Sequence, residues 1–341
     1  TFMMPTMMLI MNGVSVLIIY SGSYAVDNGT MQVGNVMAFI QYAMQIIMSF
    51  LMITAMSIML PRANVAALRI NDVLKTKVSV TDPENPVQPD ANVKGTVEFD
   101  HVSFAYPEAG ENVISDISFK AEKGETIAVI GSTGSGKSTL INLIPRFYDC
   151  TQGSIKIDGV DVMEYPKEQL IEKIGVVPQK AVLFSGTIAD NIRWGKEDAT
   201  NEEIEEALSI AQAEDFVQQK DGGIGFMLNQ GGKNLSGGQK QRLTIARALV
   251  KKPEILILDD SSSALDYATD AALRKAIKEK TDHTTVFLVS QRASSIMYAD
   301  KIVVLDDGKI AGIGDHDTLM KNCPVYQEIY ASQNKEVKAD V

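Results

Sequence analysis

The sequence has few of the residues that build disulfide frameworks or metal centres. It contains two cysteines, Cys150 and Cys323, and three histidines in 341 residues. No CxxC pair occurs, and a reducing compartment therefore fits the soluble part of the chain. Acidic residues outnumber basic ones, which gives a net charge of −11. Nucleic-acid binding needs a basic face, so we expect no nucleic-acid partner.

Charge is almost absent from the first 60 residues, where Asp27 is the only charged side chain and twelve of the sixteen methionines lie. Residues 2–20 and 36–60 are apolar runs, and about 20 apolar residues cross a bilayer as a helix. We predict two membrane spans joined by a turn over residues 21–35. Two buried helices of a soluble core are the alternative, which is disfavoured because 60 residues with one charge are rare in such helices.

The distribution of basic residues predicts the orientation of these spans. Arg62, Arg69, Lys75 and Lys77 follow the second span, whereas the turn between the spans has no Lys or Arg. The positive-inside rule then places everything from residue 61 onward in the cytoplasm of a multi-pass cell-membrane protein. Because the chain opens inside a hydrophobic run, we expect further membrane helices upstream, since two spans make a poor pore.

The pattern changes after the second span. A helix is predicted to continue to residue 78, which ends a membrane segment over residues 1–78. Prolines 83, 86 and 89 mark residues 79–94 as an extended linker. Residues 95–332 interleave strands and helices, which predicts an α/β domain with a largely parallel sheet and an added antiparallel layer, and residues 333–341 read as a polar tail. The predicted helices are 137–147, 202–212, 236–250, 268–280 and 315–320. A β region is predicted to begin at residue 95, where Val97, Phe99, Val102 and Phe104 alternate with mostly polar residues, and the further predicted strands are 113–119, 126–130, 155–157, 174–177, 255–259, 285–289 and 302–305.

Residues 131–138 read GSTGSGKS, preceded by the apolar strand TIAVI and followed by a helix. This is the G-x-x-x-x-G-K-[ST] loop in the context that it requires, because glycines let backbone N–H groups curl around phosphate oxygens at a helix N-terminus. Lys137 can reach the β- and γ-phosphates, and the Ser138 hydroxyl can ligate Mg²⁺. The predicted phosphate-binding residues are Gly131, Ser132, Thr133, Gly134, Ser135, Gly136, Lys137, Ser138 and Thr139.

Residues 255–259 read ILILD, a buried strand that ends in an acid. A helix cap is the simpler explanation for such an acid on its own. Next to a phosphate loop of this type, Asp259 is instead expected to help hold Mg²⁺.

Residues 235–239 read LSGGQ and continue as KQRLTIARAL. This segment resembles the signature motif of the ATP-binding cassette (ABC) family, and Ser236 would cap a helix whose glycines allow a phosphate to approach closely. The resemblance implies that this phosphate belongs to ATP bound on a partner domain. The residues assigned to the partner's ATP are Leu235, Ser236, Gly237, Gly238, Gln239 and, from SALD at 263–266, which resembles the D-loop, Asp266.

Other family elements match in order. Tyr106 resembles the aromatic residue that stacks on adenine, and Gln179 in VVPQ resembles the glutamine that contacts Mg²⁺ and senses the membrane domain. The resemblance covers residues 95–332, and the preceding helices resemble the last two membrane helices of an exporter half-transporter. It implies a P-loop NTPase fold with an antiparallel β subdomain and a helical signature subdomain. The implied ligands are ATP and Mg²⁺, with the metal held by Ser138, Gln179 and Asp259.

The sequence departs from the family pattern at three places. After Asp259 the family usually has a glutamate that activates water, and here Asp260 sets the carboxylate back by roughly 1–1.5 Å. The family's switch histidine is replaced by Gln291, which can hydrogen-bond a phosphate but cannot titrate. Asn229 and Gln230 stand where exporters often carry Gly-Glu. Harmless drift would explain each change alone.

Two changed catalytic positions in one chain resemble the degenerate half of a heterodimeric exporter. The implied catalytic residues are Asp260, Gln291 and Gln179, in a site that binds ATP and hydrolyses it poorly. The implied partners are a non-identical half-transporter with intact Glu and His, the membrane and a transported substrate. The alternatives are an ATP-gated channel or regulatory subunit and, less favoured because of the spans, a soluble ABC ATPase.

Overall fold

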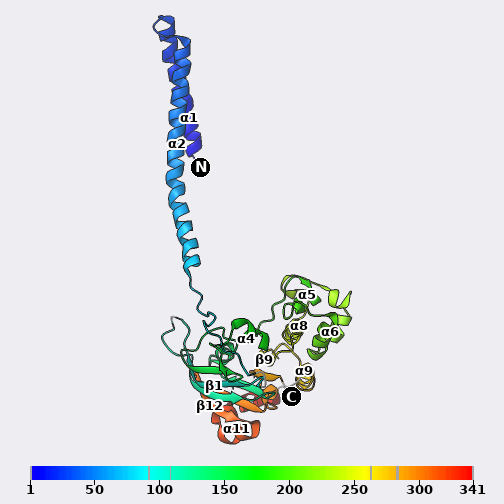
Figure 1. The fold of residues 1–341 in the computed structure, drawn as a ribbon. Coiled ribbons are helices and arrows are strands. Elements are labelled where there is room, and N and C mark those ends of the chain that lie inside the picture. The colour runs from blue at the N-terminus through cyan, green and yellow to red at the C-terminus, as the bar shows by residue number, and fades with distance from the viewer. Residues whose placement is uncertain (1, 91–92, 108, 262, 282–283, 340–341) are drawn as a thin grey trace. The chain divides into compact units, whose positions relative to one another are not determined.

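The computed structural model describes residues 2–90, 93–107, 109–261, 263–281 and 284–339, and for residues 3 and 334–339 only the backbone. Contacts divide the chain into two units, Thr1–Val78 and Ser79–Val341. Figure 1 shows both.

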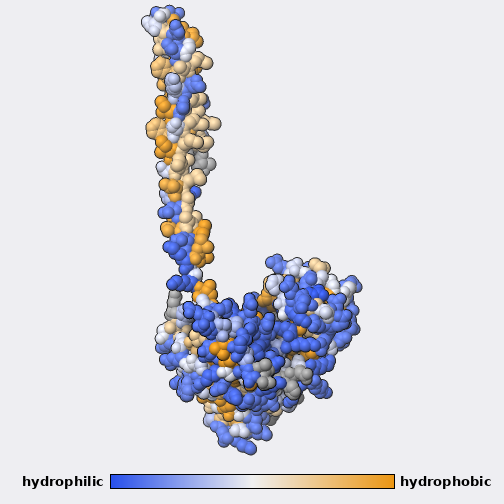
Figure 2. Space-filling view, viewed as in Figure 1, coloured by the Kyte–Doolittle hydropathy of each residue, from blue (hydrophilic) through white to orange (hydrophobic). Residues whose placement is uncertain are grey.

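The first unit consists of two apolar helices that lie side by side, α1 (Met3–Asp27) and α2 (Val33–Lys75) (Figure 1). Within the described residues, both are long and apolar enough to cross a membrane. Their side chains are almost all exposed, and apolar residues cover much of the surface of this unit in Figure 2. Residues 21–27, predicted as part of a turn, are helical, and the helix predicted to reach residue 78 ends at Lys75.

The second unit contains a six-stranded sheet with strand order β12–β11–β3–β10–β9–β6, in which only β12 is antiparallel to its neighbour. A four-stranded antiparallel sheet has the order β2–β1–β4–β5, and β7 pairs with β8. The strand bounds are β1 Val97–Phe104, β2 Ile114–Ala121, β3 Thr126–Gly131, β4 Gln152–Ile157, β5 Val160–Asp161, β6 Ile174–Val177, β7 Gly186–Thr187, β8 Met227–Leu228, β9 Ile255–Asp259, β10 Thr285–Val289, β11 Lys301–Asp306 and β12 Lys309–Gly314. The predicted fold class is confirmed.

The six-stranded sheet is buried on both faces, which explains why its parallel strands are nearly continuous runs of apolar residues. Alternate residues of β3 belong to two different cores. Ile127 and Val129 pack with the antiparallel sheet and α3, whereas Ala128 and Ile130 pack with a core that includes α8 and α12. Of the flanking helices, α3 contacts β3, β9 and β10.

The helices of this unit are mostly short. Their bounds are α3 Lys137–Leu143, α4 Lys167–Lys173, α5 Ile188–Arg193, α6 Asn201–Ile210, α7 Glu214–Gln218, α8 Gly237–Leu249, α9 Tyr267–Lys280, α10 Ala293–Ile296, α11 His316–Asn322 and α12 Pro324–Ala339, with 3₁₀ turns at Gly223–Gly225 and Gln230–Gly232. The helix predicted over 137–147 ends at Leu143. Residues 333–339 of the predicted polar tail continue α12, and residues 340–341 lie outside the described part of the chain.

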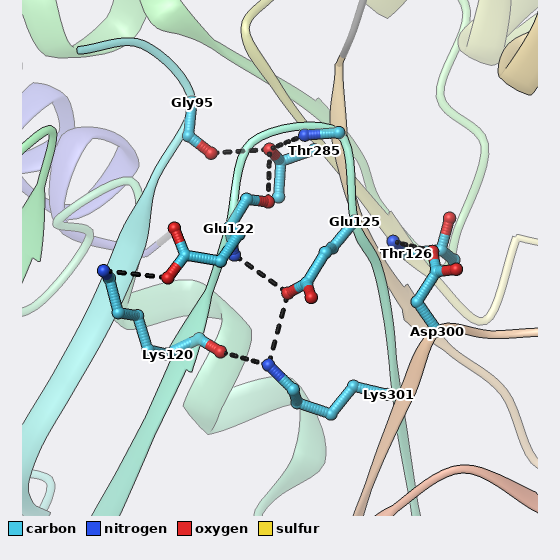
Figure 3. Close-up of polar contacts among 9 residues, drawn as sticks. Gly95, Lys120, Glu122, Glu125, Thr126, Thr285, Asp300 and Lys301 are labelled. Carbon is cyan, nitrogen blue, oxygen red and sulfur yellow. Dashed lines mark hydrogen bonds and ion pairs between the residues drawn. The ribbon is translucent and has the colours of Figure 1, made fainter.

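A polar network joins the two sheets at the end where the parallel strands begin (Figure 3). The fully buried Thr285 hydroxyl, at the start of β10, donates to the Gly95 carbonyl at 2.5 Å and accepts from the Gly124 N–H at 3.0 Å. Lys301, at the start of β11, binds the Glu125 carboxylate at 3.2 Å. Because the phosphate loop follows the other end of β3, this network supports the fold and leaves the opposite edge of the sheet free for chemistry.

Candidate functional site

The loop between β3 and α3 can adopt its conformation only with glycine at fixed positions. Gly134 and Gly136 have φ values of +87° and +94°, in the left-handed region that favours glycine. A Cβ at Gly136 would lie 2.7 Å from the Ile114 side chain. One at Gly131 would lie 2.2 Å from the Leu305 carbonyl oxygen. The backbone path of the loop and its close packing on Ile114 and Leu305 therefore require glycine at these positions.

Lys137 lies over this loop. Its ammonium group donates to the carbonyl oxygens of Gly131 at 3.0 Å and Ser132 at 2.7 Å. Burial lowers the pKa of Lys137, and the charges of Asp260 and Asp259 oppose that shift. A partly desolvated cation beside a glycine-rich loop is suited to a polyanionic ligand such as a phosphate chain.

Ser138 and Asp259 form the second part of the site. The Ser138 hydroxyl donates to the Asp259 carboxylate at 3.2 Å, and this bond joins the first turn of α3 to the end of β9. Burial raises the pKa of Asp259, and the Ser138 hydrogen bond partly opposes the shift. Among the described residues there is no cluster of three His, Cys, Asp or Glu side chains for a metal. A hydroxyl and a carboxylate are nevertheless the oxygen donors that fit Mg²⁺ when phosphate oxygens complete its shell.

Asp260 follows β9 and is nearly buried, with 8% of its surface exposed. Two side-chain amides approach the same oxygen, Oδ2: Gln179 Nε2 at 3.3 Å and Gln291 Nε2 at 3.5 Å. The parallel pairing of β9 with β10 explains this meeting, because it sets Asp259 opposite Val289, two residues before Gln291. The φ of Asp260 is +45°, a left-handed conformation that aspartate tolerates better than most residues.

A cavity of about 370 Å³ unites these groups. Its walls come from the phosphate loop, α3 and the ends of β6, β9 and β10, with Val113 added from the segment before β2. Ten of the residues predicted for ATP, Mg²⁺ or catalysis line this cavity, and Gly131, Ser132 and Ser135 of the phosphate loop are not among its lining residues. The predicted residues that line the cavity are Thr133, Gly134, Gly136, Lys137, Ser138, Thr139, Gln179, Asp259, Asp260 and Gln291.

Tyr106 is not among the described residues that line this cavity. Its hydroxyl lies 3.1 Å from the Thr139 hydroxyl, so it reaches α3 directly behind the loop. Its ring packs edge-on against Phe104 and Tyr148, with centroid distances of 4.9 and 5.2 Å. The proximity to the loop fits a base-stacking role, which stays a prediction.

The LSGGQ segment lies apart from the cavity, since none of residues 235–239 is among the described residues that line it. Ser236 caps α8 in a reciprocal capping box: its hydroxyl accepts from the Gln239 N–H at 3.3 Å, and its own N–H donates to the Gln239 side chain at 3.1 Å. A Cβ at Gly238 would lie 3.0 Å from the Ala264 carbonyl oxygen. Gly238 therefore lies against the segment 263–266, whereas a Cβ at Gly237 would meet open space.

Asp266 has a structural role that the sequence interpretation did not include. Its carboxylate caps α9 by accepting from the Thr269 N–H at 2.9 Å and the Thr269 hydroxyl at 2.8 Å. These bonds lower the pKa of Asp266. The sequence does contain a signal for this role, because Asp is one of the residues favoured at the N-cap of a helix.

Arg292 is a further residue that sequence reasoning missed. Its guanidinium group donates to the carbonyl oxygens of Ser263 at 3.2 Å and Leu265 at 3.4 Å. It thereby joins the loop of Gln291 to the segment that follows Asp260. No local pattern predicts this bond, because the acceptors are backbone carbonyls nearly thirty residues earlier.

Comparisons with known proteins agree with this geometry. Residues 114–263 match the family model described as ABC transporter. An uncharacterized ABC transporter ATP-binding protein of Mycobacterium bovis is 46% identical over 335 residues, which are 97% of this chain and 57% of that protein. A Bacillus subtilis protein named "Probable multidrug resistance ABC transporter ATP-binding/permease protein YheI" is 39% identical over 329 residues, 96% of this chain and 56% of that protein.

A solved structure of a bacterial Atm1-family ABC exporter with ATP bound superposes with a TM-score of 0.78 at 31% identity. The match covers 96% of this chain and 57% of that one. The chain thus spans a little over half the length of the relatives it matches.

Proposed function

This chain belongs to the ABC transporter family, and we propose that it is the degenerate-site half of a heterodimeric exporter. Its nucleotide-binding domain would couple ATP binding and hydrolysis to the passage of a substrate across the membrane. The proposal of a degenerate site rests on one observation: the Gln291 amide nitrogen lies 3.5 Å from the Asp260 carboxylate oxygen Oδ2. Both changed catalytic positions therefore face the same cavity.

The exporter part of the proposal is supported by the two apolar helices and by the relatives. The helices indicate association with a membrane, and the matches to the YheI protein and to the solved Atm1-family exporter each cover 96% of this chain, this segment included. The basic residues after the second span support a cytoplasmic position for the soluble domain in a multi-pass protein.

Weak hydrolysis at this chain's own site follows from the surroundings of Asp260. A general base must accept a hydrogen bond from the attacking water. Here Gln179 and Gln291 both direct amide N–H groups at Oδ2, and the side chain is one methylene shorter than glutamate. Gln291 can donate to a γ-phosphate but carries no charge to stabilise the transition state. The site is then suited to holding ATP more than to cleaving it.

The ligand-binding roles follow from the same contacts. Lys137 would exchange its two carbonyl acceptors for β- and γ-phosphate oxygens. Ser138 and Asp259, already hydrogen-bonded, would hold Mg²⁺ together with Gln179, and the metal would neutralise phosphate charge. Tyr106 would stack on the adenine. The signature residues 235–239 and Asp266 would complete the hydrolytic site on the partner half.

Co-purification from native membranes tests this function most directly. We expect a second, non-identical half with glutamate and histidine at the positions of Asp260 and Gln291, and ATP-dependent substrate flux against a gradient by the pair. Flux that only follows the gradient would instead support an ATP-gated channel. Recovery of an active assembly made of this chain alone would refute the heterodimer.

A further inference from the structure

Helix α12 reaches the loop of Gln291 through one side chain. The Gln333 amide nitrogen donates to the Gln291 carbonyl oxygen at 2.6 Å. Its amide oxygen accepts from the Ala293 N–H at 2.7 Å. The Gln333 side chain thus bonds to the backbone on both sides of Arg292. Because one backbone partner is a carbonyl and the other is an N–H, the orientation of the Gln333 amide is determined.

These two bonds satisfy groups that the loop itself leaves open. Ala293 is the first residue of α10, and the N–H groups of a first helical turn have no partner within the helix. The residue before it, Arg292, provides no side-chain cap. Gln333 therefore supplies a cap from forty residues away and, by the same amide, fixes the carbonyl of Gln291.

A second set of bonds holds the same loop to Asp260 and to the segment that follows it. Arg292 binds the carbonyl oxygens of Ser263 and Leu265, and the Gln291 side chain meets Asp260 at 3.5 Å. The segment 290–293 therefore lies between two anchors, the segment after Asp260 and α12. Loss of either anchor would free the backbone that aims the Gln291 amide.

Helix α12 is itself held in place by buried contacts with the rest of its unit. Tyr326 is fully buried, and its hydroxyl lies 2.8 Å from His316 Nδ1. Ile329 packs against the core, and Gln333 follows it by four residues on the same helix face.

We propose that Gln333 is a positioning residue for Gln291, so that α12 sets how the γ-phosphate end of this chain's own site is held. The proposal rests on the proposed function, in which Gln291 faces that phosphate. Gln333 itself touches no ligand. It acts by holding the main chain of residues 291–293 in one conformation, which aims the Gln291 side chain into the cavity.

The test uses the full chain assembled with its partner half and a photoreactive azido-ATP, with labelling of each subunit resolved by electrophoresis. The variants are Gln333→Ala, Gln291→Ala and the double variant. The matched control is Gln327→Ala, because Gln327 lies in the same helix and loses one hydrogen bond to the Met320 carbonyl, away from the site. Lys137→Ala reports separately on the nucleotide site.

Gln333→Ala should raise the concentration of azido-ATP for half-maximal labelling of this subunit by roughly fivefold, as loss of one Gln291 hydrogen bond to the γ-phosphate would. Gln327→Ala should leave it unchanged. In the Gln291→Ala background, Gln333→Ala should have no further effect, because its action passes through Gln291. Equal effects of the Gln333 and Gln327 variants, or a full effect without Gln291, would overturn the proposal.

Gln333→Glu provides a second variant if the alanine variant fails to assemble. It keeps an acceptor for the Ala293 N–H and loses the donor to the Gln291 carbonyl, so labelling should weaken while assembly persists. Wild-type labelling of this variant would also overturn the proposal. If Lys137→Ala leaves labelling of this subunit unchanged, the nucleotide-site assignment itself fails, which distinguishes that outcome from failure of the Gln333 proposal.

Discussion

The substitution Gly238→Asp should remove most of the ATPase activity of the assembled pair, although Gly238 lies outside this chain's own nucleotide cavity. The added Cβ would lie 3.0 Å from the Ala264 carbonyl oxygen, so the segment 263–266 would have to shift by a few tenths of an ångström. In the proposed pair the new carboxylate would face the partner's γ-phosphate, and at a separation of about 4 Å the repulsion would be about 4 kcal/mol at an effective dielectric constant of 20. That energy corresponds to roughly a thousandfold loss of rate.

Asp260→Asn should have a much smaller effect on the same activity. The side chain keeps its shape, and its oxygen can still accept from Gln179 and Gln291, which lie 3.3 and 3.5 Å from Oδ2. Because this site is proposed to contribute little hydrolysis, steady-state turnover should stay within about twofold of wild type, about 0.4 kcal/mol in barrier height.

The assay is steady-state ATP hydrolysis by the purified pair, with assembly of each variant checked by gel filtration. Gly238→Asn is the matched control, because it adds nearly the same bulk without the charge and should retain more activity than Gly238→Asp. If Asp260→Asn silences the pair while Gly238→Asp is tolerated, Asp260 is a working general base and the degenerate-site proposal is wrong.

Three further substitutions test single contacts. Lys137→Ala should abolish or strongly weaken ATP binding at this chain's site, and unchanged photolabelling of this subunit would contradict the role of the loop. Tyr106→Ala should weaken ATP binding by about 1–3 kcal/mol if the ring stacks on adenine. Tyr106→Phe, which loses only the contact with Thr139, should cost less, and equal losses in an equilibrium binding assay would assign the effect to that hydroxyl. Thr285→Val should lower the thermal unfolding midpoint by roughly 2–10 °C, because the buried Gly95 carbonyl loses its partner at about 1–3 kcal/mol, whereas the exposed Gly124 N–H can bond water instead. Its ATP half-saturation should stay unchanged, and a shifted affinity with an unchanged midpoint would refute a purely structural role.

The sequence predicted best those features that depend on local geometry. The phosphate loop needs glycines at fixed spacings between a strand and a helix, and the structure places Gly134 and Gly136 at positive φ as that spacing requires. The parallel strands were also predictable, because burial on both faces makes them continuous apolar runs. The capping of α8 by Ser236 follows from the same kind of local signal.

Features that depend on distant parts of the chain were not predictable. Helices α4, α5 and α10 have seven residues or fewer, and tertiary contacts decide whether such short segments become helical. Strand β12 contains Gly312 and Gly314, which weaken a strand signal. Arg292 and Gln333 bind backbone groups far away in sequence, and a backbone acceptor leaves no trace in residue identity.

The left-handed backbone at Asp260 has a consequence for substitutions at this position. Aspartate is among the few non-glycine residues that visit this conformation readily, since its short side chain can bond locally, and a longer acid loses that advantage at a cost of roughly 1–2 kcal/mol. The Asp260 carbonyl is also held by the Ser263 hydroxyl at 2.8 Å, which resists relaxation of the turn. In this chain, replacing Asp260 with glutamate would strain the main chain as well as lengthen the side chain. Restoring hydrolysis at the proposed weak site would therefore depend on the turn at 260–263 as well as on residue 260.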